Sequence, residues 1–355
     1  MKKMKTGIHV VAGVLLLAGS LSVQAAWSPL EVEAIAEDNA RSPITYTALD
    51  KAAEPWNVCV SFPHMKDSFW LAADYGVTEE AKRQGINVQV LDAGGYTQLN
   101  NQISQIENCV AGGAKAVIIG AISQDGLGNL VADLKKKGVH VVDAYNGIAS
   151  KDVDAHVLTI PSDEGLRAGR YLAAKHPAGS PAVKVAWLPG PAGAGWVELF
   201  NSGFLEGIKG SAVQIAETKY GDTGKEIQAR LIEDLLQTHK DIDYVVGTAV
   251  TAEAAVPVLR ARGITDKTKI VSVYTTPGVY QGVKSGAIEA AGMAPVVLVG
   301  RIAVDQAIRL IEGKDVHRNV GPVGRVYQKQ DVDSLDIETV LAPDNFRPVF
   351  RVSAK

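Results

Sequence analysis

Acidic and aromatic side chains gather in this sequence directly after short apolar segments. The stretch "FPHMKDSFW" at 62–70 is the clearest case, with one acid and three aromatic residues around a lysine. Aromatic faces attract positive charge by about 0.5–2 kcal/mol each. Rings with one or two carboxylates therefore suit a cation, or a strong dipole that lacks donors. The candidate ligand-binding residues are Asp67, Phe69, Trp70, Tyr96, Tyr145, Trp196, Glu198 and Tyr274.

Each candidate also has a purely structural interpretation. Asp67 precedes a predicted helix, where an aspartate commonly caps the first turn. Trp70, one turn into that helix, could belong to the core, and the tyrosines could cover the ends of their strands. Glu198 could be a solvated helix residue. The sequence leaves both interpretations open.

Motifs of the common catalytic and metal sites are absent from the sequence. It contains no H-E-x-x-H, no C-x-x-C and no G-x-S-x-G. The glycine-rich stretch "GPAGAG" at 190–195 is not a Walker loop, because no Gly-Lys-Ser/Thr follows it. We therefore expect a binding protein with no catalytic residues, no bound metal and no cofactor.

The candidates follow a regular alternation of strand-like and helix-like segments. Short β-branched segments such as "WNVCVSF" and "KAVIIGA" alternate with amphipathic segments of helix length. Strands that are apolar on both faces and separated by helices indicate parallel βαβ units. One series begins at Trp56 and a second near residue 163. Two consecutive series favour two lobes over one very wide sheet.

The predicted architecture is α/β, with two doubly wound parallel-sheet lobes joined by a three-crossover hinge. The crossings are expected near 159–162, 290–294 and 322–327. Ligands bind beyond the carboxyl ends of strands in open parallel sheets, which places the candidates at a cleft between the lobes. The expected boundaries are 1–25 for a signal peptide, 26–55 for an extended N-terminal arm, 56–160 plus 293–323 for the N-terminal lobe, and 161–292 plus 324–355 for the C-terminal lobe.

The first 25 residues have the pattern of a secretory signal peptide. Three lysines precede an apolar run that is followed by small residues up to Ala25. The run is short for a membrane span, which needs roughly 20 apolar residues. Without those lysines the chain has 33 basic and 39 acidic side chains, a net charge of about −6. An acidic chain with no basic block is a poor candidate for binding nucleic acid.

Two cysteines, Cys59 and Cys109, remain in the exported chain. An oxidising compartment permits a disulfide between them. Two buried free thiols are the alternative.

Several segments resemble the type I periplasmic sugar-binding protein superfamily, which has two lobes and three crossovers. The combination of "KDSFW", "AGGY" and "FRPVF" is similar to a branch of it that senses trimethylamine N-oxide. The resemblance covers nearly the whole mature chain. It implies a periplasmic protein that closes on this ligand or a similar methylated amine and forms a complex with the periplasmic domain of a membrane sensor histidine kinase.

The same resemblance implies ligand contacts for Asp67, Trp70 and Tyr274, which match the branch's K-D-S-Y-W and S-V-Y segments. This sequence departs from the branch's motifs at two places, and both change the expected ligand contacts. Phe69 replaces the usual tyrosine and lacks its hydroxyl, and "IPSDEG" at 160–165 stands where relatives can have an aromatic residue. Trp196 could restore the missing ring, or it could indicate a different ligand.

Two functional hypotheses follow. The first is a sensor of trimethylamine N-oxide or a similar methylated amine that signals through a kinase. The second is a solute-binding subunit of an ABC importer for a sugar or another small molecule. Glu198 and Tyr274 align with positions where sugar-binding relatives place arginine and aspartate, which disfavours ribose-like ligands.

Overall fold

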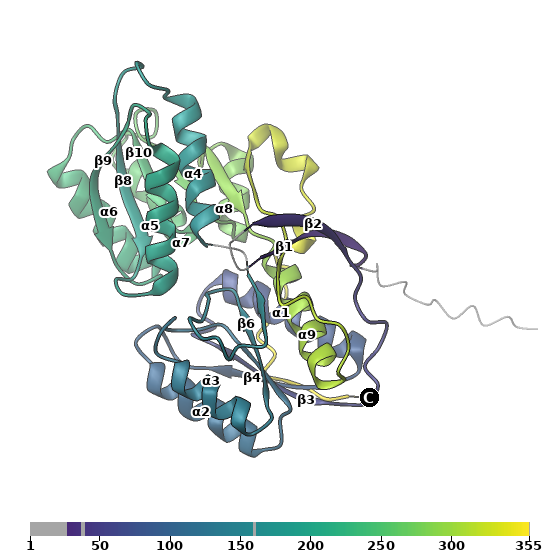
Figure 1. Cartoon of the computed structure of the whole chain (residues 1–355). Helices are drawn as coiled ribbons and strands as arrows, with labels where there is room; N and C mark the ends of the chain where they lie inside the picture. Colours follow the sequence, from purple (N-terminus) through teal and green to yellow (C-terminus); the bar gives the residue numbers. More distant parts are fainter. Residues whose placement is uncertain (1–26, 37–39, 159–160, 355) are drawn as a thin grey trace, which may run out of the picture.

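The strands of the computed structural model form two mainly parallel sheets with helices packed against them (Figure 1). The structure describes residues 27–36, 40–158 and 161–354, so the predicted signal peptide lies outside the described residues. Within these ranges, no helix combines the length and the apolar composition that crossing a membrane requires. The two sheets correspond to the two lobes expected from the sequence.

The first sheet is buried on both faces because its central strands carry apolar side chains on both sides. In β3, Val58 and Val60 belong to one buried cluster, whereas Cys59 belongs to a second cluster on the opposite face. The strand order is β15-β4-β3-β5-β6-β7-β13-β1-β2, and β3 to β7 and β13 run parallel. The elements of this lobe are β3 (Asn57–Phe62), α1 (Ser68–Gln84), β4 (Asn87–Asp92), α2 (Leu99–Ala111), β5 (Ala116–Ile119), α3 (Gly128–Lys136), β6 (His140–Ala144), β7 (Ala155–Val157), α9 (Val296–Ile311) and β13 (Asn319–Gly321).

The second sheet has the strand order β14-β12-β11-β10-β8-β9, with only β14 antiparallel to its neighbour among the described strands. Two short 3₁₀ helices, η1 (Lys329–Ser334) and η2 (Ile337–Thr339), follow β14. The elements of this lobe are α4 (Pro161–Lys175), β8 (Val183–Gly190), α5 (Gly195–Ile208), β9 (Val213–Tyr220), α6 (Lys225–Thr238), β10 (Tyr244–Gly247), α7 (Ala249–Ala261), β11 (Lys269–Ser272), α8 (Pro277–Ser285), β12 (Ala290–Met293) and β14 (Arg325–Gln328).

The chain passes between the two sheets at three closely spaced connections, as expected for a hinge. They lie at 158–161, 294–295 and 322–324. The segment 335–350 then returns to the first lobe, where β15 (Arg351–Val352) pairs with β4. The sequence-based boundary assigns all of 324–355 to the C-terminal lobe, whereas β15 belongs to the sheet of the N-terminal lobe. The reason is that Val349 N donates to the buried Asp74 of α1 (2.7 Å), which directs the tail to the edge of the first sheet.

The expected N-terminal arm contains a β-hairpin made of β1 (Leu30–Ile35) and β2 (Arg41–Tyr46). β1 pairs antiparallel with β13, so the hairpin extends the first sheet at the junction between the lobes (Figure 1). Arg41 also forms an ion pair with Asp163 of α4 in the second lobe. The hairpin therefore contacts both lobes beside the hinge.

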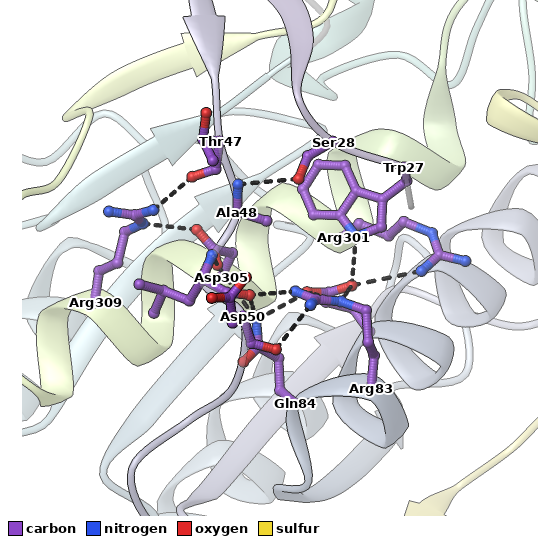
Figure 2. A network of polar contacts seen from close by, with 12 residues as sticks. Trp27, Ser28, Thr47, Ala48, Asp50, Arg83, Gln84, Arg301, Asp305 and Arg309 are labelled. Atoms are coloured by element: carbon purple, nitrogen blue, oxygen red, sulfur yellow. Dashed lines mark hydrogen bonds and ion pairs between the residues drawn. The ribbon is translucent and has the colours of Figure 1, made fainter. Parts of the chain in front are cut away.

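Two buried carboxylates attach the N-terminal segment to the helices of the first lobe (Figure 2). Asp305 of α9 accepts hydrogen bonds from the Tyr46 hydroxyl (2.5 Å), from Leu49 N (2.7 Å) and from Arg309 Nε (2.7 Å). Glu80 of α1 accepts one from Trp27 Nε1 (2.7 Å) and also pairs with arginines of α1 and α9. Such a network is strongly destabilised when one charged member is removed, because the others remain buried without a partner.

The disulfide between Cys59 and Cys109 is present, which confirms the first of the two alternatives for these cysteines. It joins the central strand β3 to helix α2 across a separation of 50 residues. The disulfide attaches α2 to β3, the first strand of the first βαβ unit. The ends of that unit's strands lead into the candidate residues. The disulfide therefore constrains the lobe that carries most of them.

We predict that Asp305→Ala lowers the free energy of unfolding by about 3–5 kcal/mol, because Arg309 loses its buried counter-charge and the N-terminal segment loses its anchor. Urea denaturation measures this change, and limited proteolysis should show faster cleavage within 40–55. Asp133→Ala is the matched control, since Asp133 forms an exposed pair with Lys136 (3.0 Å) and its loss should leave stability nearly unchanged. Equal effects of the two substitutions would contradict the anchoring role of Asp305.

Candidate functional site

A small cavity lies between the two lobes, where the carboxyl ends of both parallel sheets face each other. Its volume is about 40 Å³. Seven of its eleven lining residues are aromatic, two are acidic and none is basic, so the wall offers ring faces and negative charge. The lining residues are Asp67, Phe69, Trp70, Tyr96, Tyr145 and Asn146 from the first lobe, and Glu164, Trp196, Phe200, Thr223 and Tyr274 from the second.

Asp67 both caps a helix and faces the cavity. Its Oδ1 accepts hydrogen bonds from Phe69 N (3.0 Å) and Trp70 N (3.2 Å), which starts α1. Its Oδ2 lies 4.0 Å from His64 Nε2. One oxygen is thus used by the helix, while the residue also lines the cavity. The capping and ligand-contact interpretations of Asp67 are therefore compatible.

Burial governs the electrostatics of this acid and its neighbour. Burial raises the pKa of Asp67, although His64 and the two backbone N–H groups partly oppose the rise. Burial likewise lowers the pKa of His64, which favours the neutral imidazole. A positive group placed in the cavity would favour the ionised form of Asp67.

Two ring pairs connect the lobes around the cavity. Phe69 meets Tyr274 edge to face with ring centroids 5.4 Å apart, and Tyr96 meets Trp196 at 5.8 Å. These are favourable aromatic geometries, worth about 0.5–1.5 kcal/mol each beyond area burial. Because each pair joins residues of different lobes, the structure represents a closed arrangement.

Tyr145 has an unusual backbone conformation for its residue type. Its φ of 72° lies in the left-handed region, which costs of order 1–3 kcal/mol for a residue other than glycine. The conformation is held by its ring, which packs edge-on against Phe69 (5.8 Å) and Trp70 (5.5 Å). Strain of this kind persists where surrounding contacts determine it, and here those contacts form the cavity wall.

The second-lobe wall depends on close packing between α4 and α5. Gly165 of α4 lies against the backbone of Phe200, and Gly203 of α5 lies against the backbone of Ser162. A Cβ at either glycine would overlap the other helix, so only glycine permits this approach. The packing holds Glu164, in the first turn of α4, beside the rings of α5 at the cavity.

The structure brings seven of the eight candidate residues together in the cavity wall. The exception is Glu198, which is exposed and does not line the cavity. Its position on α5 explains this, because Trp196 and Phe200 are four residues apart and share one face. Glu198 lies about 200° around the helix axis from Trp196. Ligand contact by the other seven stays a prediction.

Four lining residues were not among the candidates: Asn146, Glu164, Phe200 and Thr223. Three had a usable signal. Asn146 and Thr223 follow the strands β6 and β9, so the strand-end rule includes them, and Phe200 follows Trp196 by one helical turn. Glu164 had no usable signal in the sequence, since acidic residues are common in the first turn of a helix for structural reasons alone.

Trp70 belongs to the core as well as to the cavity wall. Its side chain is only 2% exposed and contacts the rings of Phe62 (5.2 Å) and Tyr145 (5.5 Å). Phe69, by contrast, is partly exposed and contributes one ring of an interlobe pair. Substitutions at these adjacent positions should therefore have different consequences.

The arrangement of ring faces and carboxylates can bind a small cation or dipole. Serine, cysteine, lysine and histidine are all absent from the eleven lining residues. Across the ranges that the structure describes, no group of three or more His, Cys, Asp or Glu side chains is arranged to hold a metal ion. Ring faces, carboxylates, the Asn146 amide and the hydroxyls of Thr223 and the three tyrosines are the functional groups of the wall.

Comparison with known proteins places this geometry among binding proteins. The family described as "Periplasmic binding protein domain" matches residues 58–315. The periplasmic protein TorT of Escherichia coli K12 is 36% identical over 302 residues, which cover 84% of this chain and 86% of TorT.

Solved structures are similar over most of the chain. An ABC transporter solute-binding protein from Bradyrhizobium sp. BTAi1 with bound Bis-Tris is 52% identical, with a TM-score of 0.81, covering 92% of this chain and 99% of that one. TorT in complex with the TorS sensor domain, in the presence of trimethylamine N-oxide, is 32% identical, with a TM-score of 0.76, covering 83% and 99%.

We predict that Phe69→Ala weakens ligand binding at least tenfold while lowering stability only modestly, because the ring closes the cavity from a partly exposed position. Trp70→Ala should instead cost about 3–5 kcal/mol of stability, as expected for a fully buried tryptophan. Thermal unfolding and calorimetric titration separate the two effects. Glu198→Ala is the control from helix α5 outside the cavity wall, and a loss of binding in that variant would show that the cavity is wrongly assigned.

Proposed function

Because this chain belongs to the periplasmic binding protein family, we propose that it senses trimethylamine N-oxide or a similar small methylated amine in the periplasm. The closed form is proposed to be recognised by the periplasmic domain of a membrane sensor histidine kinase. The observation that carries the proposal is the composition of the interlobe cavity: seven rings, two carboxylates and no basic residue.

The chemistry of the wall matches the positive end of such a ligand. A methylated nitrogen has no N–H to donate, so it gains from ring faces and from negative charge rather than from directed hydrogen bonds. A sugar has hydroxyl groups around its whole ring and needs many paired polar groups. Most lining residues present rings and no arginine or lysine is among them, so a sugar would find few of the paired charged groups that its hydroxyls need.

The size of the cavity supports the same class. A volume of about 40 Å³ corresponds to roughly three or four water molecules, since one needs about 10–15 Å³ on this measure. A ligand of this size has few non-hydrogen atoms, as trimethylamine N-oxide does. A pentose or Bis-Tris is much larger than trimethylamine N-oxide and is a poorer match to a cavity of this volume.

The relatives support both the ligand and the partner. TorT of Escherichia coli K12 shares more than a third of its aligned residues with this chain, and a TorT that is 32% identical to this chain has been solved with the TorS sensor domain both without ligand and with trimethylamine N-oxide. Closure of two lobes on a hinge is a common way to convert ligand binding into a change of shape. In this chain the ring pairs Phe69–Tyr274 and Tyr96–Trp196 would form when the lobes close and separate when they open.

We propose that the protein binds its ligand without transforming it. The buried Asp67 and its neighbour His64 are the titratable groups closest to a possible reaction centre. Both are accounted for as a helix cap and a buried neutral ring. No lining residue could serve as a serine, cysteine or lysine nucleophile.

A second function is favoured by one observation. The Bradyrhizobium solute-binding protein is more similar in sequence to this chain than TorT is, and it is described as part of an ABC transporter. The Bis-Tris bound to it is a tertiary amine, and trimethylamine N-oxide is the oxide of one. An importer subunit for a small amine would use the same cavity, so the two functions differ in the partner rather than in the ligand class.

Calorimetric titration of the mature protein tests the ligand class. We expect micromolar binding of trimethylamine N-oxide and no measurable binding of ribose, because the wall cannot pair sugar hydroxyls. Choline and betaine extend the series to larger methylated amines. Micromolar binding of ribose, with none of the three amines, would contradict the proposal.

Analytical ultracentrifugation with the periplasmic domain of the sensor kinase from the same organism tests the partner. The sensory function predicts a complex at micromolar concentration whose stability changes when the amine is added. The importer function predicts no complex, and loss of amine uptake when the protein is deleted from cells. Absence of a complex together with loss of amine uptake would favour the importer function over the sensory function.

A further inference from the structure

We propose that the indole N–H of Trp196 donates a hydrogen bond to an oxygen of the ligand, so that the site selects a methylated amine carrying an acceptor over a bare methylated cation. This inference rests on the proposed function and adds a specificity-determining residue to it. It is carried by the position, the burial and the missing partner of one side chain.

The orientation of the Trp196 ring is fixed from several sides. Gly190, with a φ of 130°, lies against the Cη2 and Cζ3 edge of the indole, where a Cβ would overlap the ring. Phe200 packs edge-on at 5.3 Å, and Tyr96 of the other lobe approaches at 5.8 Å. The six-membered ring is therefore held toward the end of β8, and the indole cannot turn freely within the wall.

The Nε1 donor of Trp196 is buried without a hydrogen-bond partner among the described residues, and the side chain as a whole is 7% exposed. Other tryptophans of this chain do have partners. Trp27 donates to Glu80 (2.7 Å), Trp56 to Glu312 (2.9 Å) and Trp187 to Asn201 (2.7 Å). An unpaired buried donor is destabilising, so it is uncommon unless a ligand or water completes it.

The rest of the wall explains which end of a ligand this donor would meet. Asp67 and Glu164 line the same cavity and are suited to positive charge. The Asn146 amide donates to Ala121 O (2.8 Å) and to the Tyr96 hydroxyl (3.3 Å), so it is already used. The wall thus combines acceptors for a positive end with a buried donor, Trp196 Nε1, that has no partner among the described residues, which fits a compact dipole.

The consequence is a measurable discrimination between two ligands of similar size. Trimethylamine N-oxide and the tetramethylammonium ion both present a methylated nitrogen to the rings, but only the first carries an acceptor oxygen. A ligand without an acceptor leaves the Trp196 N–H unpaired in a closed site. The expected preference for the N-oxide is about tenfold to a hundredfold.

The test compares wild type and Trp196→Phe with both ligands by calorimetry. Phenylalanine keeps an aromatic face and removes only the N–H donor. We expect Trp196→Phe to lose at least tenfold in affinity for the N-oxide and to change its affinity for tetramethylammonium by less than about threefold. Trp187→Phe is the matched control, because its indole bonds to Asn201 outside the cavity, and it should leave both affinities unchanged.

A spectroscopic measurement on the wild-type protein covers the case in which Trp196→Phe folds poorly. The indole ¹H–¹⁵N resonance of Trp196 should move downfield on addition of the N-oxide and much less with tetramethylammonium. Equal losses for both ligands in Trp196→Phe, unchanged N-oxide binding in that variant, or an indole resonance insensitive to the N-oxide would overturn the inference alone. If wild type binds neither ligand, the proposed function is contradicted and the inference with it.

Discussion

A carboxylate buried among aromatic rings without an adjacent cation is the feature on which this site depends. Asp67 gives one oxygen to the first turn of α1 and faces a neutral His64 with the other. Burial opposes its charge, and no lysine or arginine lines the cavity to compensate. A positive group on a ligand would supply this charge and favour the ionised form of Asp67 when the two lobes close around it.

The fold places this acid where closure can use it. Both sheets present the carboxyl ends of parallel strands to the same gap, so residues far apart in the sequence meet there. The glycine contacts between α4 and α5 bring Glu164 and the ring of Trp196 to the opposite wall. The N-terminal segment and the disulfide act away from the cavity, where they stabilise the first lobe around Asp305 and Cys59.

The two-lobed fold and most of the cavity wall could be predicted from the sequence, because strand ends in parallel sheets have a fixed functional position. Asp67, Tyr96 and Tyr274 were identified by that rule. Glu198 does not line the cavity, because the direction of its side chain depends on its angular position around α5. The strand-end rule does not determine that angle.

The remaining features depend on tertiary partners that no local pattern reveals. The hairpin within 26–55 pairs with β13, which lies hundreds of residues later in the chain, and its strands have little apolar periodicity of their own. The return of β15 to the first sheet depends on one buried acceptor, Asp74. Glu164 enters the wall only through the packing of two helices.

A crystal structure of the mature protein grown with trimethylamine N-oxide tests the central claim most directly. The account predicts the ligand in the interlobe cavity, with its methylated nitrogen within about 6 Å of the surrounding ring centroids and its oxygen at hydrogen-bond distance from Trp196 Nε1. A ligand bound elsewhere, or closed lobes around an unoccupied cavity at saturating ligand, would contradict it.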